Sequence, residues 1–232
     1  MEQIKYLLIG IIFSSAISSS LQCAYENCAD WANPGQSQKH TMCLYPTTAL
    51  GNKCNEGRII QLTEADKQYI LQLHNELRAK VASGGESQGS NGPQPAGKIG
   101  PLKWDNEIAE IAQRWVNQCT FEHDKCRNTK ANSVGQNLYM MGSSEKSENT
   151  HDILTASVNS WYSEVKDFDN RSVREYKFEF TTGHYSQVVW GDTTHVGCGL
   201  VQYKDSGFYT TMVACNYSPA GNLIGGTVYP TL

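Results

Sequence analysis

Apolar residues recur at helical spacing in three stretches of the chain, which predicts three amphipathic helices. The first spans residues 64–82 and follows Thr63, which together with Asp66 has the pattern of a capping box. The second follows Asp105, a residue suited to cap its N-terminus, and the third covers residues 153–165. The apolar positions are Ile70, Leu73, Leu77 and Val81, then Ile108, Ala109, Ala112, Trp115 and Val116, then Ile153, Leu154, Val158, Trp161, Tyr162 and Val165.

After Lys177 the pattern changes to short runs of β-branched and aromatic residues, which predict strands at FEF, HYSQVVW, HVGCGLVQY and FYTTMVACNY. A further candidate strand is SVGQNLYMMG, between the second and third helices. Sixteen residues separate Cys198 from Cys215, so a hairpin that sets these cysteines opposite each other has Ser206 and Gly207 as its turn. Glycine adopts the positive φ of such a turn easily, so a cross-strand disulfide is predicted.

Two stretches lack this periodicity. Residues 83–101 are dense in glycine, serine and proline, and they predict a loop because the helices on both sides need partners for their apolar faces. Residues 21–61 hold four cysteines and predict a disulfide-stapled N-terminal arm, which leaves residues 62–232 as one domain.

The first 20 residues have the pattern of a secretory signal peptide. Lys5 precedes an apolar run that is shorter than the roughly 20 residues of a membrane span, and small residues follow it. No later stretch is long enough to span a membrane, so the mature chain is expected to be secreted and soluble.

Composition narrows the class of protein further. The 232 residues are 39% hydrophobic, which is enough for a core, and the net charge of −4 argues against nucleic-acid binding. All eight cysteines follow the leader, and an even number in an exported chain predicts four disulfides. The sequence contains no HExxH, GxSxG or P-loop motif.

Histidine is a common metal ligand and general base, so the six histidines are candidates for chemistry. His40 and His151 are expected to be solvated. His74, on the same predicted helix as Arg78, is expected to be structural. His184, in GHYSQVVW, is by itself also more typical of a hydrogen-bonded structural residue.

Several separated motifs together resemble the CAP superfamily of cysteine-rich secretory proteins, insect antigen five and plant pathogenesis-related proteins. GHYSQVVW and ACNYSPAGN resemble its two signatures, and HNELR and GQNL match as well. The four-cysteine arm, GPQPAGK, PLKWDNEIAEIAQRWVNQC, VGQNL and the step from Cys119 to Cys126 are most similar to the insect venom allergen five group. The resemblance covers nearly the whole mature chain.

The resemblance implies an α+β fold, a three-layer α-β-α sandwich with an antiparallel central sheet and the disulfide-stapled arm. It assigns residues 62–232 to the CAP domain. It also implies four disulfides, Cys23–Cys43, Cys28–Cys126, Cys54–Cys119 and Cys198–Cys215. The hairpin register predicts the last of these independently.

Members of the superfamily commonly have a central cleft lined by two histidines and two acids, and in some members the histidines bind zinc. The corresponding residues here are His123, His184, Glu164 and, in place of one acid, Gln136. A glutamine neither accepts a proton as a general base nor supplies an anionic ligand, which makes hydrolysis less expected. The expectation is weak zinc binding by His123 and His184, with no required cofactor.

The resemblance thus implies a secreted, non-enzymatic venom or salivary protein that binds a host extracellular protein or lipid and can be allergenic. A monomer is expected. Two alternatives stay open: a cleft hydrolase or peptidase that uses His184 with Glu164, and a carrier of sterol or fatty acid. Asn170, in an Asn-Arg-Ser acceptor sequence, is a candidate glycosylation site.

Overall fold

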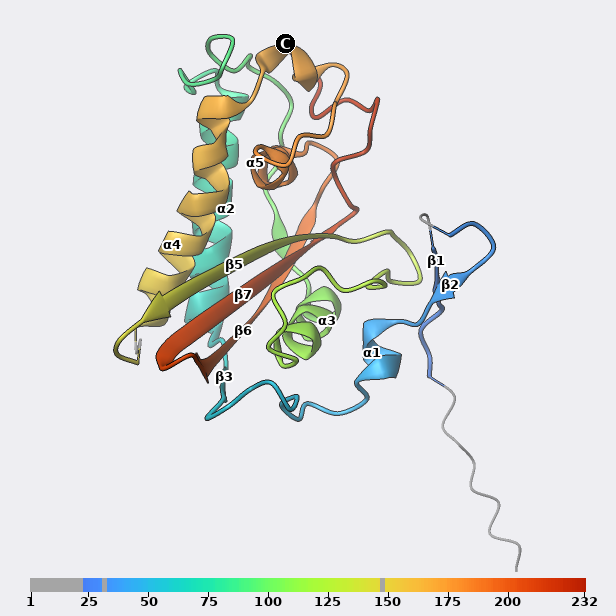
Figure 1. Ribbon diagram of the computed structural model, residues 1–232. Coiled ribbons are helices and arrows are strands. Elements are labelled where there is room, and N and C mark those ends of the chain that lie inside the picture. Colours follow the sequence, from blue (N-terminus) through green and yellow to red (C-terminus); the bar gives the residue numbers. More distant parts are fainter. Residues whose placement is uncertain (1–22, 31–32, 147–148) are drawn as a thin grey trace, which may run out of the picture.

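The computed structural model describes residues 23–30, 33–146 and 149–232 (Figure 1). The predicted signal peptide, residues 1–20, lies outside the described residues. A central sheet separates α2, α4 and α5 from α3, so the chain has the expected α+β sandwich (Figure 1). Within the described ranges, no helix is both long and apolar enough to cross a membrane.

The three predicted helices are present, and the first two begin at the predicted caps, whereas the third begins after Asn149. Thr63 accepts a hydrogen bond from the backbone N–H of Asp66, whose carboxylate accepts one from the N–H of Thr63. Asp105 caps α3 in a similar way. The helices are α1 (Thr41–Leu44), α2 (Glu64–Ala82), α3 (Asn106–Val116), α4 (Thr150–Ser163) and α5 (Gly183–Val189), with the short 3-10 helices η1 (Glu164–Asp167) and η2 (Asn170–Val173).

The strands form two sheets. They are β1 (Cys28–Ala29), β2 (Ser37–Gln38), β3 (Arg58–Ile60), β4 (Lys103–Trp104), β5 (Gly135–Ser143), β6 (His195–Asp205) and β7 (Phe208–Ser218). The arm carries β1 and β2, and the central sheet has the antiparallel order β3-β6-β7-β5, with β4 parallel to β6. The hairpin prediction is confirmed, because Cys198 pairs with Cys215 and Ser206 and Gly207 form the turn with positive φ.

Four disulfides are present, in the pairs that the resemblance implies. Cys23–Cys43 lies within the arm, and Cys28–Cys126 and Cys54–Cys119 join the arm to the rest of the domain. The fourth disulfide joins β6 to β7. Glycines on β6 let α3 approach the sheet closely. A Cβ added at Gly197 would lie 2.4 Å from the backbone N of Ala109, and one at Gly199 would lie 2.4 Å from the Cα of Gln113.

The strand predictions for HYSQVVW and FEF are wrong. HYSQVVW belongs to α5, whose Tyr185, Val188 and Val189 are fully buried, so tertiary packing overrides the strand preference of its β-branched residues. FEF is irregular, with Phe180 90% exposed and Phe178 lying beside the start of α5.

Arg78 explains how the short helix α5 ends. Its guanidinium is buried and donates to four backbone oxygens, two of which, those of Val188 and Trp190, belong to the C-terminal end of α5. The other two belong to Gly100 and Thr193. Burial lowers the pKa of Arg78 to about 10, so the side chain stays charged at neutral pH and complements the negative end of the helix dipole.

The expectation that His40 is solvated is wrong. The side chain is buried and stacks on Tyr25, with ring centroids 4.3 Å apart. Nδ1 accepts from the N–H of Met42 and Nε2 donates to the carbonyl of Asn128, so His40 caps α1 and holds it against a distant loop. Burial lowers the pKa of His40.

His74 and His151 follow the predictions more closely. His74 is buried between the carbonyl of Ile70 and the hydroxyl of Tyr217, a structural position. His151 is 47% exposed and stacks on Tyr69.

We expect Arg78→Met to lower the free energy of unfolding by about 3 kcal/mol or more, because four backbone carbonyls lose their donor and three of them belong to buried residues. Arg174→Met, at an exposed arginine, is the control and should change stability by no more than about 0.5 kcal/mol. Urea unfolding measures both variants. Equal losses in the two would contradict the assigned role of Arg78.

Candidate functional site

The four predicted cleft residues come from separate segments and form two hydrogen-bonded pairs. His123 lies in the loop after α3 and donates through Nδ1 to Oε1 of Gln136, on β5, at 2.8 Å. His184, in the first turn of α5, lies with Nδ1 2.6 Å from Oε1 of Glu164, which follows α4. Burial lowers the pKa of His123, and the positive charge of Arg127 contributes in the same direction.

Glu164 has a structural role as well as a place in the site. Its Oε2 accepts from the backbone N–H groups of His184 at 2.8 Å and Tyr185 at 3.0 Å. The carboxylate therefore caps the N-terminus of α5, where Thr182 provides no side-chain cap. Through its other oxygen it holds His184 in the tautomer with Nδ1 protonated.

Gln136 is held by acceptors on both sides of its amide nitrogen. Nε2 donates to Oδ1 of Asp124 at 3.1 Å and to Oδ1 of Asn216 at 3.0 Å. Asn216 in turn donates through Nδ2 to the carbonyl of Ile108, which leaves its oxygen facing Gln136. The side chain of Gln136 thus uses its nitrogen and its oxygen while only 8% exposed.

A groove of about 670 Å³ opens beside His123 and Gln136. One wall belongs to the N-terminal arm, and the rim opposite includes residues near α5. The lining includes Asp30, Asn33 and Gln38 from the arm, Asp124 and Arg127 from the loop that carries His123, and Asn222. The arm is therefore part of the site as well as a stapled extension.

Sequence reasoning did not identify Asp124 or Asn216 as part of the site. Asp124 directly follows His123 in FEHDKC, and Asn216 lies within the second signature, ACNYSPAGN. Both are buried, and Asn216 also lies in an Asn-Tyr-Ser acceptor sequence although its amide is engaged inside the protein. The signals that were available are the position of Asp124 next to His123 and the position of Asn216 within the second signature.

The residues present match part of a zinc site. In each imidazole Nδ1 is bound to an oxygen acceptor, which leaves Nε2 as the nitrogen able to bind a metal. Dedicated sites have three or four protein ligands, however, and the described residues contain no group of three or more His, Cys, Asp or Glu side chains that could hold a metal ion. Weak zinc binding by His123 and His184 therefore stays a prediction.

The amide of Asn170 is engaged in the loop that it contacts. Its Nδ2 donates to the carbonyls of Asn91 at 3.0 Å and Pro93 at 2.9 Å. An attached glycan replaces one of the two N–H bonds, so glycosylation of Asn170 stays a prediction that would alter this contact.

The layered fold, the stapled arm and the paired histidines define a CAP-type domain. The family model of the cysteine-rich secretory protein family, CAP, matches residues 71–217, more than half of the chain, so the chain belongs to this family. The predicted resemblance is confirmed.

The relatives of the chain include venom allergens. Venom allergen 3 of Solenopsis invicta is 46% identical over 196 residues, which cover 82% of each chain. Venom allergen 5 of Brachyponera chinensis is 45% identical over 195 residues, which cover 82% of this chain and 96% of the relative. The chain is thus venom allergen-like.

Solved structures agree with the fold. The crystal structure of NaASP2 with Zn2+ has a TM-score of 0.63 and 26% identity, and the match covers 74% of this chain and 88% of that chain. The structure of BmVAL-1 has a TM-score of 0.63 and 30% identity, with coverage of 74% and 85%. The predicted α+β sandwich is confirmed.

We expect Gln136→Glu to lower the free energy of unfolding at pH 7 by about 1–3 kcal/mol, because the new carboxylate loses two donated bonds and faces Asp124. Like charge raises the folded-state pKa of the introduced carboxyl above its unfolded value of about 4.3. The loss should therefore grow as the pH rises above that value and shrink at pH 4.

Urea unfolding at pH 7 and pH 4 measures this difference. Gln68→Glu, at an exposed position of α2, is the control. A loss that is the same at both pH values would show that charge near Asp124 is not its cause.

Proposed function

We propose that the chain is a secreted, non-enzymatic venom or salivary protein that acts by binding a host extracellular component and can be allergenic. Its membership of the CAP family and its likeness to venom allergens support this proposal. The observation that carries its non-enzymatic part concerns Glu164, whose carboxylate is bound to two backbone N–H groups and to the ring of His184.

Those bonds argue against Glu164 as the general base of a cleft hydrolase and leave His184 as the candidate base to be tested. A general base needs an available acceptor near the proton it removes, and Glu164 already serves as a helix cap and ring acceptor. The second position, Gln136, is an amide that does not take up a proton at neutral pH. Ser186, two residues after His184, is buried, and its hydroxyl is bonded to the carbonyl of Thr182 and to Asn222.

We expect the purified protein to show no hydrolysis of broad peptide and ester substrates above that of His184→Ala. His151→Ala, at an exposed histidine, is the matched control, and near-UV circular dichroism checks that each variant is folded. Hydrolysis that disappears in His184→Ala and persists in His151→Ala would establish the enzyme instead.

A second function favoured by a specific observation is weak zinc binding. His123 and His184 each bind an acceptor through Nδ1, which orients Nε2 for a ligand. Burial lowers the pKa of His123, so its Nε2 lone pair is available at neutral pH. NaASP2, a protein of related fold, has been crystallised with Zn2+, which adds support.

We expect zinc to bind the protein at pH 7 with one site, and the double variant His123→Ala/His184→Ala to bind at least about tenfold more weakly, since both nitrogen ligands are lost. Calorimetric titration measures both proteins, with His151→Ala as control. The same affinity in the unchanged protein and the double variant would remove this site.

A further inference from the structure

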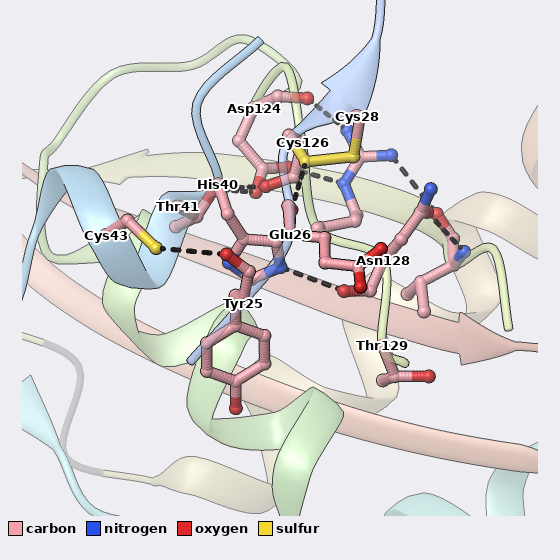
Figure 2. The surroundings of a disulfide bond; sticks show 12 residues. Tyr25, Glu26, Cys28, His40, Thr41, Cys43, Asp124, Cys126, Asn128 and Thr129 are labelled. Atoms are coloured by element: carbon pink, nitrogen blue, oxygen red, sulfur yellow. Dashed lines mark hydrogen bonds and ion pairs between the residues drawn. A yellow bond between two sulfur atoms is a disulfide. The ribbon is translucent and has the colours of Figure 1, made fainter. Parts of the chain in front are cut away.

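The N-terminal arm reaches the pair formed by His123 and Gln136 through Asp124. Asp124 is 4% exposed and accepts hydrogen bonds from three side chains. Thr41, at the start of α1 in the arm, donates to Oδ2, while Arg127 and Gln136 donate to Oδ1. Figure 2 shows Thr41 and Asp124 next to the disulfide between Cys28 and Cys126 that anchors the arm.

Two more contacts hold α1 against the loop that carries Asp124. The backbone N–H of Thr41 donates to the carbonyl of Cys126, and His40 donates to the carbonyl of Asn128 (Figure 2). The position of Asp124 is thus set by the arm as well as by its own loop.

The chemistry of these groups fixes the direction of each hydrogen bond. A carboxylate only accepts, so Gln136 must turn its NH2 group toward Asp124. Asn216 presents a second oxygen to the same NH2 group. The oxygen of Gln136 is then left for His123, whose Nδ1 must carry the proton.

We propose that the arm sets the tautomer of His123 through the series Thr41, Asp124 and Gln136, and so keeps Nε2 open to a ligand. Asp124 and Thr41 are positioning residues in this proposal. It rests on the proposed zinc site only for the identity of the ligand, because the tautomer is a property of the metal-free protein. A glutamate in place of Gln136 has no NH2 group for Asp124 and so does not fit this series.

The test is the 15N spectrum of the histidine rings in the metal-free protein at neutral pH. The unchanged protein should show His123 as a single tautomer with the proton on Nδ1. Asp124→Ala should give a measurable fraction with the proton on Nε2. Without Asp124, the amide of Gln136 can turn its NH2 group toward Nδ1 of His123 and lose only the hydrogen bond to Asn216. His184, held by Glu164, should stay unchanged in both proteins and is the internal control.

Thr41→Val should shift His123 in the same direction by less, whereas Thr41→Ser, which keeps the hydroxyl, should match the unchanged protein. Asp192→Ala, at an exposed acid, is the control for loss of a carboxylate. These variants keep the proposal testable if Asp124→Ala does not fold. Zinc affinity in Asp124→Ala should fall by the same factor as the population of the tautomer with the proton on Nδ1.

A ring of His123 with the same tautomer in the unchanged protein and in Asp124→Ala, or in Thr41→Val where only that variant folds, overturns the proposal. Absence of zinc binding by the unchanged protein would remove the metal site instead. The ring spectra then still decide whether the arm controls the tautomer.

Discussion

Helix α5 depends on charged side chains at both of its ends, and the site depends on α5. Glu164 accepts from the first N–H groups of the helix, and Arg78 donates to carbonyls at its last turn. A buried cation loses several kcal/mol of hydration, but hydrogen bonds to a charged group contribute about 1.5–3 kcal/mol each, and Arg78 makes four. Backbone carbonyls, two of them at the end of α5, thus take the place of a carboxylate as the partners of Arg78.

The shared use of Glu164 changes how the site is interpreted. The same carboxylate terminates the helix and orients the ring of His184, so the positions of both are determined together. Replacing Glu164 therefore exposes unsatisfied backbone groups at the start of α5 and releases the imidazole. A loss of any function in such a variant would not by itself identify Glu164 as a catalytic group, because the helix and the ring change at the same time.

Most of the fold could be predicted because the relevant patterns are local. The cap at Thr63 and the pairing of Cys198 with Cys215 are both encoded by neighbouring residues. α5 was not predictable in this way, since β-branched residues favour a strand and its ends are satisfied from segments distant in the sequence. Burial of His40 likewise depends on a loop far along the chain. Family resemblance pointed to His123 and His184, but the parts of Asp124 and Asn216 follow from hydrogen-bond directions that only the structure contains.

The two imidazoles are oriented by different acceptors, and the difference has a physical reason. His184 faces the carboxylate of Glu164, and a negative carboxylate is favoured at the positive N-terminal end of α5. His123 faces an amide oxygen, and the same amide donates to Asp124. A second carboxylate there would lie against the first in a buried place, where like charges repel strongly. Gln136 therefore preserves the orientation of His123 at a point where Asp124, which the arm contacts through Thr41, already places a negative charge.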